Sequence, residues 1–331
     1  MNKDHPDVKF GKTGVLLINL GTPDSTSWWD IRRYLKEFLS DRRVIEVNPI
    51  IWQIILNLFI LTFRPAKTAK AYKKIWRKEN NESPLLFFTR EQAKKLNDRI
   101  KNEKLTVDFA MRYGNPSIRS RLIKLKDDGC EHIIILPLYP QYAAATTATV
   151  CDEVYRSLMN MRWQPSLQIL PHYESEPKYI DALVSSIEKK VKEINWKPDL
   201  IISSYHGIPK SYFDKGDPYQ CYCQKTTRLM NEKFKKIEIK TTFQSRFGPQ
   251  EWLKPYTDKT LEELPKEGVK NLLIICPGFA SDCVETLEEI NIAGRESFIK
   301  SGGENFDLIP CLNDSSQHID LLHHLLKKNI H

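Results

Sequence analysis

The chain has 331 residues, which is enough for two domains of ordinary size. Its 50 Lys and Arg exceed its 42 Asp and Glu by 8, a moderate excess that favours an anionic ligand or an anionic membrane surface. The basic residues form no run of five or more and no arginine-rich stripe, so we expect no nucleic-acid partner. The first residues lack the apolar core of a secretory signal, so we expect a cytoplasmic protein.

Short apolar, β-branched runs alternate with longer segments of helical periodicity along most of the chain. The predicted strands lie at 14–20, 107–113, 132–138, 166–170, 199–205, 241–247 and 271–276. The predicted helices lie at 29–38, 117–126, 178–192, 226–236 and 284–300. This order predicts parallel sheets covered by helices on both faces, which is a doubly wound α/β fold.

One segment, VNPIIWQIILNLFILTF at residues 47–63, contains no charge and is apolar around nearly its whole helical circumference. Seventeen helical residues reach about 26 Å, short of the roughly 30 Å hydrocarbon core of a bilayer, so we expect no spanning helix. A buried core helix and an apolar lip in a membrane interface remain as alternatives. Seven Lys and Arg follow between Arg64 and Lys78 and favour the lip, hence a protein bound peripherally to the inner membrane face.

The strand ends of the two halves resemble each other. VLLINLGTP, FAMRYGNP and IIILPLYPQYAA in the first half correspond in rank to LIISSYHGIP, FQSRFGPQ and LLIICPGFASDC in the second. We therefore predict two similar domains that face a cleft, one made of residues 1–160 with 314–331 and the other of 161–313. Ligands of open α/β sheets bind outside the carboxyl ends of the strands, so His206, Arg112, Tyr139 and Asp282 are expected at this cleft.

Two stretches of the second half carry candidate chemistry. His206 stands where a buried strand ends, as a core histidine or as a proton acceptor and metal ligand over a cleft. In PGFASDCVETLEEI, Ser281 or Asp282 is expected to cap a helix on which Asp282, Glu285 and Glu289 share one face. Acids near a helix N-terminus favour its dipole, but this does not explain Glu289. A row of carboxylates facing a histidine predicts a path for a divalent cation or a proton relay.

The seven cysteines are an odd number, which argues for reduced thiols in a chain without an export signal. Only Cys221 and Cys223 are closely spaced, and such a pair is a weak sign of a metal site. Whether this pair joins Cys151 in some other arrangement is open at this point.

The segments SYHGIP, GDPY, FQSRFGPQEWLKPYTD and FASDCVETLEEI, in this order, resemble the signature segments of ferrochelatases. The resemblance runs from Val15 to the last predicted helix. It implies two Rossmann-like, chelatase-type domains that grip protoporphyrin IX in their cleft and insert Fe(II), which forms protohaem as the last step of haem biosynthesis. It also places the apolar lip at the mouth of the cleft, and it makes proteins before and after this step in the haem pathway candidate partners.

The resemblance also implies roles for particular residues. By position, His206 and Glu285 match the catalytic, iron-binding pair, and Asp282 and Glu289 match further acids that relay metal or protons. The positions that match porphyrin-binding residues are Leu20 on the pocket floor, Arg64, Tyr72 and Ser83 at the propionates, and Arg112, Tyr113 and Tyr139 on the other wall. Cys283 departs from animal members, which have histidine there.

Animal members carry an iron–sulfur cluster on a cysteine-rich extension, but here Ala144 stands at the matching upstream cysteine and the chain stops at His331. We therefore expect no such cluster, with Cys221 and Cys223 as the candidate ligands of any other, and Fe(II) as a substrate. Other functions remain open: a chelatase for another metal or tetrapyrrole such as cobalt or coproporphyrin, a non-catalytic haem or porphyrin carrier, or a two-domain solute-binding protein.

Overall fold

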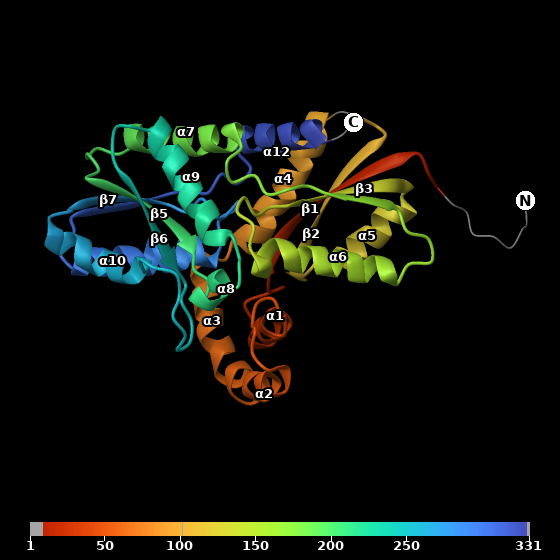
Figure 1. Ribbon diagram of the computed structural model, residues 1–331, viewed down its shortest axis with the longest axis horizontal. Helices are drawn as coiled ribbons and strands as arrows, with labels where there is room; N and C mark the ends of the chain where they lie inside the picture. Colours follow the sequence, from red (N-terminus) through yellow and green to blue (C-terminus); the bar gives the residue numbers. More distant parts are fainter. Residues whose placement is uncertain (1–8, 101, 330–331) are drawn as a thin grey trace, which may run out of the picture.

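The computed structural model describes residues 9–100 and 102–329, which form two four-stranded parallel sheets (Figure 1). The first sheet has the strand order β2-β1-β3-β4 and the second β6-β5-β7-β8. The strands are β1 (Lys12–Thr22), β2 (Leu105–Gly114), β3 (Cys130–Pro137), β4 (Ser166–Ile169), β5 (Leu200–His206), β6 (Ile239–Gln244), β7 (Asn271–Ile275) and β8 (Asn305–Ile309). The predicted fold class, two α/β domains with parallel sheets, is confirmed.

The second sheet differs from the prediction at its two edge strands. The short strand β8 was not predicted, because it is an edge strand with the polar Asp307 at its centre. Strand β6 ends at Gln244, three residues earlier than predicted, since Ser245 takes a left-handed backbone with φ 64°.

Helices cover both faces of both sheets. They are α1 (Trp28–Leu39), α2 (Pro49–Ile55), α3 (Leu61–Ile75), α4 (Pro84–Ile100), α5 (Ile118–Asp127), α6 (Thr149–Met159), α7 (Pro177–Glu193), α8 (Lys210–Asp214), α9 (Tyr219–Lys233), α10 (Thr257–Glu263), α11 (Arg295–Lys300) and α12 (Ser316–Asn329). The π-helical segments are η1 (Leu56–Ile60), η2 (Ala144–Ala148) and η4 (Glu285–Gly294), and η3 (Leu264–Glu267) is a 3₁₀ turn. Short π segments occur frequently at functional sites.

The two sheets share one apolar core on the face covered by α4, α7, α9 and α12. Side chains alternate along a strand, so Val15 and Leu17 of β1 enter this core, whereas Leu16 and Ile18 pack in a second core with α5 and α6. Ile201 and Leu273 of the second sheet belong to the same core as Val15. The two domains are therefore joined by packed side chains as well as by the chain.

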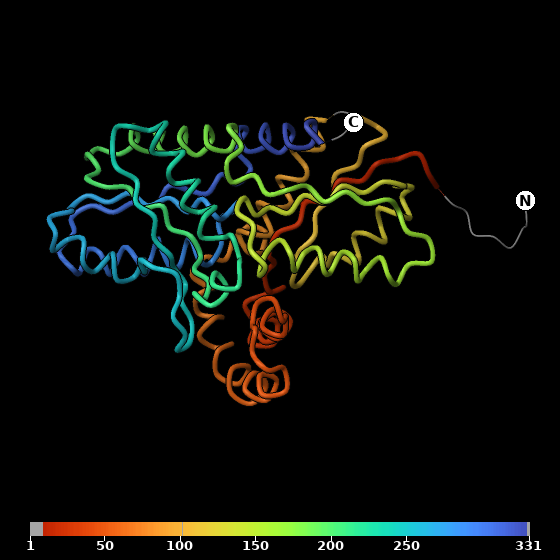
Figure 2. Tube along the Cα trace, viewed as in Figure 1, coloured from red at the N-terminus to blue at the C-terminus, as the bar shows by residue number. Residues whose placement is uncertain are grey.

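The predicted domain boundaries stay a prediction, but the structure bears on two parts of them. Strand β4 pairs with β3, so the first sheet extends beyond the boundary placed at residue 160. The C-terminal helix α12 packs back on α4, as Figure 2 shows, and Arg99 pairs with Asp320 between them. The outermost parts of the predicted first domain, residues 1–8 and 330–331, lie outside the described residues.

The apolar lip, residues 47–63, belongs to a longer helical rod that projects from the body of the molecule (Figure 1). The rod runs from Pro49 to Ile75, through α2, η1 and α3, with Asn48 as its N-cap. In the described part of the chain it is the one helix whose length and composition suit a membrane span, and only 17% of its most apolar window is buried. It is longer than the predicted segment, so the argument from length against a span does not apply to it. Its second half, however, packs on α1 and η4.

Candidate active site

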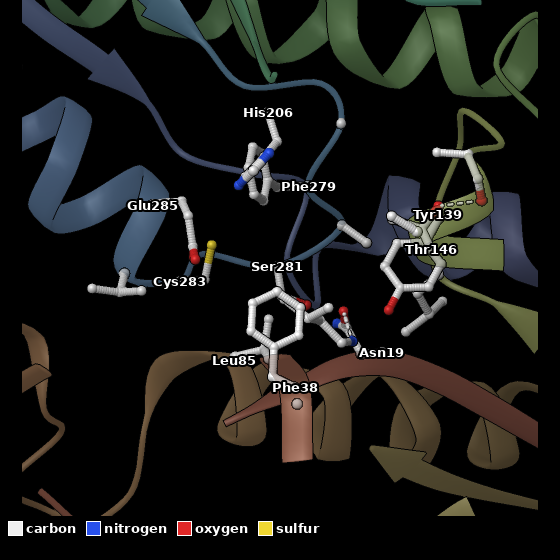
Figure 3. Close-up of a pocket in the computed structure, with 18 of the residues that line it drawn as sticks. Asn19, Phe38, Leu85, Tyr139, Thr146, His206, Phe279, Ser281, Cys283 and Glu285 are labelled. Atoms are coloured by element: carbon white, nitrogen blue, oxygen red, sulfur yellow. Dashed lines mark hydrogen bonds between the residues drawn. The ribbon is translucent and has the colours of Figure 1, made fainter. Parts of the chain in front are cut away.

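A deep cavity lies between the two domains, at the carboxyl ends of strands from both sheets, where open α/β folds bind ligands. Its volume is about 1160 Å³ when the open space at its mouth is included. Its walls are mainly aromatic and aliphatic, and Figure 3 shows side chains of both domains reaching into it. Such a site fits a large apolar ligand that carries few polar groups.

His206 ends β5 and lines the cavity, half-buried. Its Nδ1 lies 2.7 Å from the carbonyl oxygen of Gly207. A carbonyl only accepts, so Nδ1 carries the hydrogen and Nε2 of the neutral ring keeps its lone pair. Gly207 fits closely here, because a Cβ at this position would lie 3.0 Å from the Gln244 carbonyl oxygen and 3.1 Å from the Trp252 ring, and these neighbours would have to shift by a few tenths of an ångström. The alternative that His206 is a core histidine is wrong, since its ring lines the cavity.

Glu285 is the first residue of the π-helix η4 and also lines the cavity. In Figure 3 its carboxylate and the His206 ring project into the same part of the cavity, with the Cys283 thiol beside the carboxylate. Burial raises the pKa of the Cys283 thiol, and the nearby Glu285 charge raises it further. Cys283 is therefore a neutral thiol at neutral pH, whereas His206 and Glu285 offer a nitrogen and an oxygen ligand side by side.

Glu289 lies behind this pair. Its carboxylate accepts hydrogen bonds from the Ser245 backbone N–H (2.7 Å) and the Ser245 hydroxyl (2.5 Å). Burial raises the pKa of Glu289, and the neighbouring His206 acts in the opposite sense. Glu289 is thus within electrostatic reach of His206, but it is held by the residue that follows β6.

Asp282 does not line the cavity. It is 5% exposed, and its carboxylate accepts hydrogen bonds from Thr286, Asn313 and the Cys311 backbone. The prediction that Ser281 or Asp282 caps this helix is wrong. The π-helix starts at Glu285, and no side chain caps it. The predicted single face for Asp282, Glu285 and Glu289 assumed an α-helix with Ser281 or Asp282 as its N-cap, so it does not hold.

The predicted porphyrin-binding residues fall into three groups. Leu20, Tyr72, Ser83 and Tyr139 line the cavity. Arg64 lies close by, and its guanidinium stacks on Phe247 with 4.5 Å to the ring centroid. Burial lowers the pKa of Arg64, and the charge of Glu285 acts in the opposite sense, so Arg64 lies near Glu285.

Two buried polar atoms near the cavity lack a partner within the described residues, namely Arg64 Nη1 and the Tyr139 hydroxyl. Tyr139 lines the cavity, and its hydroxyl oxygen is buried in the cavity wall. Buried polar groups are nearly always hydrogen-bonded, so these two donors indicate a ligand that carries hydrogen-bond acceptors.

Arg112 and Tyr113 lie behind the residues that line the cavity. Arg112 pairs with Asp41 and donates to the Thr149 hydroxyl and carbonyl, and the Tyr113 hydroxyl lies 3.0 Å from the Asp41 carboxylate. Both side chains are buried in this network. They support the first-domain wall near Tyr139 and do not line the cavity.

Several cavity residues were not predicted. They include Asn19, Phe38, Gln141, Thr146, Trp252, Phe279 and Ser281. Asn19 interrupts an otherwise apolar strand at its carboxyl end, and this signal was present in the sequence. Phe38 and Trp252 come from a helix and a loop, so only the tertiary fold brings them to the cavity.

The cysteines carry no visible cluster site in the described residues. Cys221 is exposed, Cys223 is buried and Cys151 is intermediate, and all three are free thiols. Across residues 9–100 and 102–329, His, Cys, Asp and Glu form no group of three or more placed to hold a metal ion.

Two facing α/β domains around one deep cavity define a protein of the chelatase fold. SirB from Bacillus subtilis with Fe³⁺ has this fold, with a TM-score of 0.56 and 11% identity over 96% of this chain and 95% of that chain. The ferrochelatase family model matches residues 12–330. The ferrochelatase of Rhizobium meliloti (strain 1021) is 54% identical over 99% of this chain and 98% of its own length. That of Francisella tularensis subsp. holarctica (strain OSU18) is 52% identical over 97% of each. The chain belongs to the ferrochelatase family, as its signature segments predicted.

Proposed function

We propose that the cavity binds protoporphyrin IX and that His206 and Glu285 deliver Fe(II) to it, so that protohaem forms and two protons leave. Membership of the ferrochelatase family makes the chain an enzyme that inserts iron into a porphyrin. One observation supports the assignment of the site above all others: an imidazole with a free Nε2 lone pair and a carboxylate share one wall of a large apolar cavity.

The chemistry needs these two groups. Fe(II) replaces two pyrrolic N–H protons, so the site requires ligands that release the cation and a base that accepts protons. Neutral imidazole suits both tasks near pH 7, and a carboxylate binds divalent cations and takes up protons. No electron is transferred and no bond to the protein forms.

The remaining walls fit the rest of the substrate. A planar macrocycle hides its nitrogen lone pairs from an approaching cation, so binding that bends the ring favours insertion. Aromatic and aliphatic walls on both sides suit such a grip. The unpartnered Arg64 and Tyr139 donors suit the propionate carboxylates.

The direct test is anaerobic incubation of the purified protein with Fe(II) and protoporphyrin IX, followed by the absorbance bands of haem. We expect protohaem to form with the enzyme and not with buffer. Coproporphyrin with Fe(II), and Co(II) or Zn(II) with protoporphyrin, are run in parallel. Faster turnover of coproporphyrin, or of cobalt, would overturn the substrate assignment. Porphyrin binding without metal insertion would instead support the carrier function.

We further propose that the protein is cytoplasmic and binds peripherally to the inner face of the membrane through the apolar lip. The lip exposes Ile50, Ile51, Ile54, Leu58, Phe59 and Phe63, each by at least half of its surface. Lys67, Lys70, Lys73 and Lys74 follow on α3. Apolar area enters the headgroup boundary, and each cation near anionic lipid adds about 1 kcal/mol. This route suits a substrate that is poorly soluble in water.

We expect the protein to bind anionic vesicles more tightly than neutral ones and to dissociate as salt rises. Replacing Ile54, Leu58 and Phe59 by Ser should weaken vesicle binding about tenfold or more, since each buried apolar side chain contributes roughly 1.5–3 kcal/mol. The apparent KM for protoporphyrin should rise, while turnover of a more soluble porphyrin is unchanged. Vesicle flotation and steady-state kinetics measure these effects.

The control is Tyr155→Ser with Met159→Ser, because these α6 residues are 53% and 80% exposed and lie outside the lip. This control should bind vesicles like the parent protein. If the triple lip variant unfolds, the segment is core and the membrane proposal fails. It also fails if both variants bind vesicles equally.

A further inference from the structure

We propose that Asp282 and Asn313 form a hydrogen-bonded clamp that positions Glu285, and that Asp282 acts in the reaction as a positioning residue instead of as a metal ligand or proton carrier. The inference concerns the same metal insertion as the proposed function. It assigns a role to Asn313, which lies between β8 and α12 and was not predicted from the sequence.

The two side chains join in both directions. The Asp282 backbone N–H donates to Asn313 Oδ1 at 2.8 Å, and Asn313 Nδ2 donates to Asp282 Oδ2 at 2.7 Å. The Asn313 backbone N–H also donates to the Ala280 carbonyl oxygen at 3.1 Å. Asn313 has φ 46°, a left-handed conformation that asparagine adopts more readily than most residues. The clamp thus fixes residues 280–282, immediately before the helix that carries Glu285.

The other carboxylate oxygen of Asp282 extends the clamp to the active site. Asp282 Oδ1 accepts from the Thr286 hydroxyl at 3.0 Å and from the Cys311 backbone N–H at 3.3 Å. Thr286 follows Glu285 directly, and its hydroxyl oxygen accepts from the Cys283 backbone N–H at 3.0 Å. Three of the roughly four acceptor positions of the carboxylate are therefore occupied by protein groups.

The first domain holds the same segment. Gln92 of α4 donates from Nε2 to the Asn313 carbonyl at 2.8 Å and lies 2.9 Å from the Ser281 hydroxyl. Gln92 and Asp282 are buried, and Asn313 is partly buried. The carboxylate of Glu285 thus takes its place from contacts that span both domains. Catalysis depends on such placement, since a shift of about 1 Å can cost roughly a hundredfold in rate.

The two side chains can be exchanged without losing any of these hydrogen bonds, and this provides the test. In the Asp282→Asn variant, the side-chain NH₂ group faces another hydrogen-bond donor in either orientation of the amide. This donor is Asn313 Nδ2 in one orientation and the Cys311 backbone N–H in the other. In Asn313→Asp, two carboxylates face each other. In the double variant Asp282→Asn, Asn313→Asp, the amide at 282 donates to the carboxylate at 313. That carboxylate still accepts from the backbone N–H of 282, and the amide oxygen still accepts from Thr286 and Cys311.

We expect each single variant to lower kcat about tenfold or more, with the KM for protoporphyrin changed less than about threefold, and the double variant to recover to within about threefold of the parent. The same exchange at the exposed pair Asp24 and Asn115 should leave kcat unchanged. Thermal unfolding of each variant separates loss of fold from loss of placement. If Asp282 carries metal or protons, the double variant stays as inactive as Asp282→Asn, and the proposal is overturned.

A second variant covers the case in which the exchanged pair does not fold. Asn313→Gly keeps the left-handed backbone and the Asp282 carboxylate but removes the clamp. We expect kcat to fall about tenfold or more with a retained fold. Parent-like turnover in Asn313→Gly would overturn the clamp. The parent enzyme in the same assay tests the proposed function separately, because its inactivity would contradict metal insertion itself.

Discussion

Replacing His206 by alanine is expected to abolish metal insertion while porphyrin affinity stays within about tenfold, or roughly 1.4 kcal/mol. The imidazole supplies the free Nε2 lone pair on the cavity wall, whereas most of the porphyrin contact comes from apolar side chains. Turnover measured anaerobically and porphyrin binding measured by fluorescence quenching check the two parts of this result.

The control is His323→Ala, since His323 lies on α12, away from the cavity. It should keep parent activity. Retention of more than a few per cent of turnover in His206→Ala would show that another group provides the base and the metal ligand.

Glu285→Gln should also cost turnover far more than porphyrin affinity, because an amide binds a dication poorly and accepts no proton. Glu289→Gln should cost less. Glu289 lies behind the cavity and is held by Ser245, although burial raises its pKa. Turnover and KM of both variants, measured over a range of pH, test this order.

Glu288→Gln is the matched control, because Glu288 lies on the same π-helix but forms an ion pair with Lys74 at the surface. It should retain nearly full activity. Equal losses in Glu285→Gln and Glu289→Gln would mean that the two carboxylates act as a unit, so that no graded relay exists.

The strands and the position of His206 could be predicted because they depend on local pattern. Runs such as LLIIC have few alternatives to a buried parallel strand, and a polar residue at the end of such a strand faces the ligand side of the sheet. The same reasoning placed Tyr139 correctly in the cavity.

The predictions failed where a tertiary contact replaces a local one. The spacing of Asp282, Glu285 and Glu289 suits an α-helical face, but the segment forms a π-helix that starts at Glu285, and Asn313 holds Asp282 elsewhere. Arg112 likewise ends an apolar strand, yet Asp41 and Thr149 draw it out of the cavity. None of these three partners is near in sequence, so periodicity alone could not reveal these contacts.

The core shared by the two sheets has a mechanical consequence. Because Val15 and Ile201 belong to one continuous apolar core, swinging the domains apart like a hinge would expose that core to water. We therefore expect the two walls of the cavity to keep their spacing, so that a flat macrocycle that enters adapts to them. Two domains held rigidly in this way can bend a porphyrin ring, whereas domains joined only by a flexible linker would move apart around it.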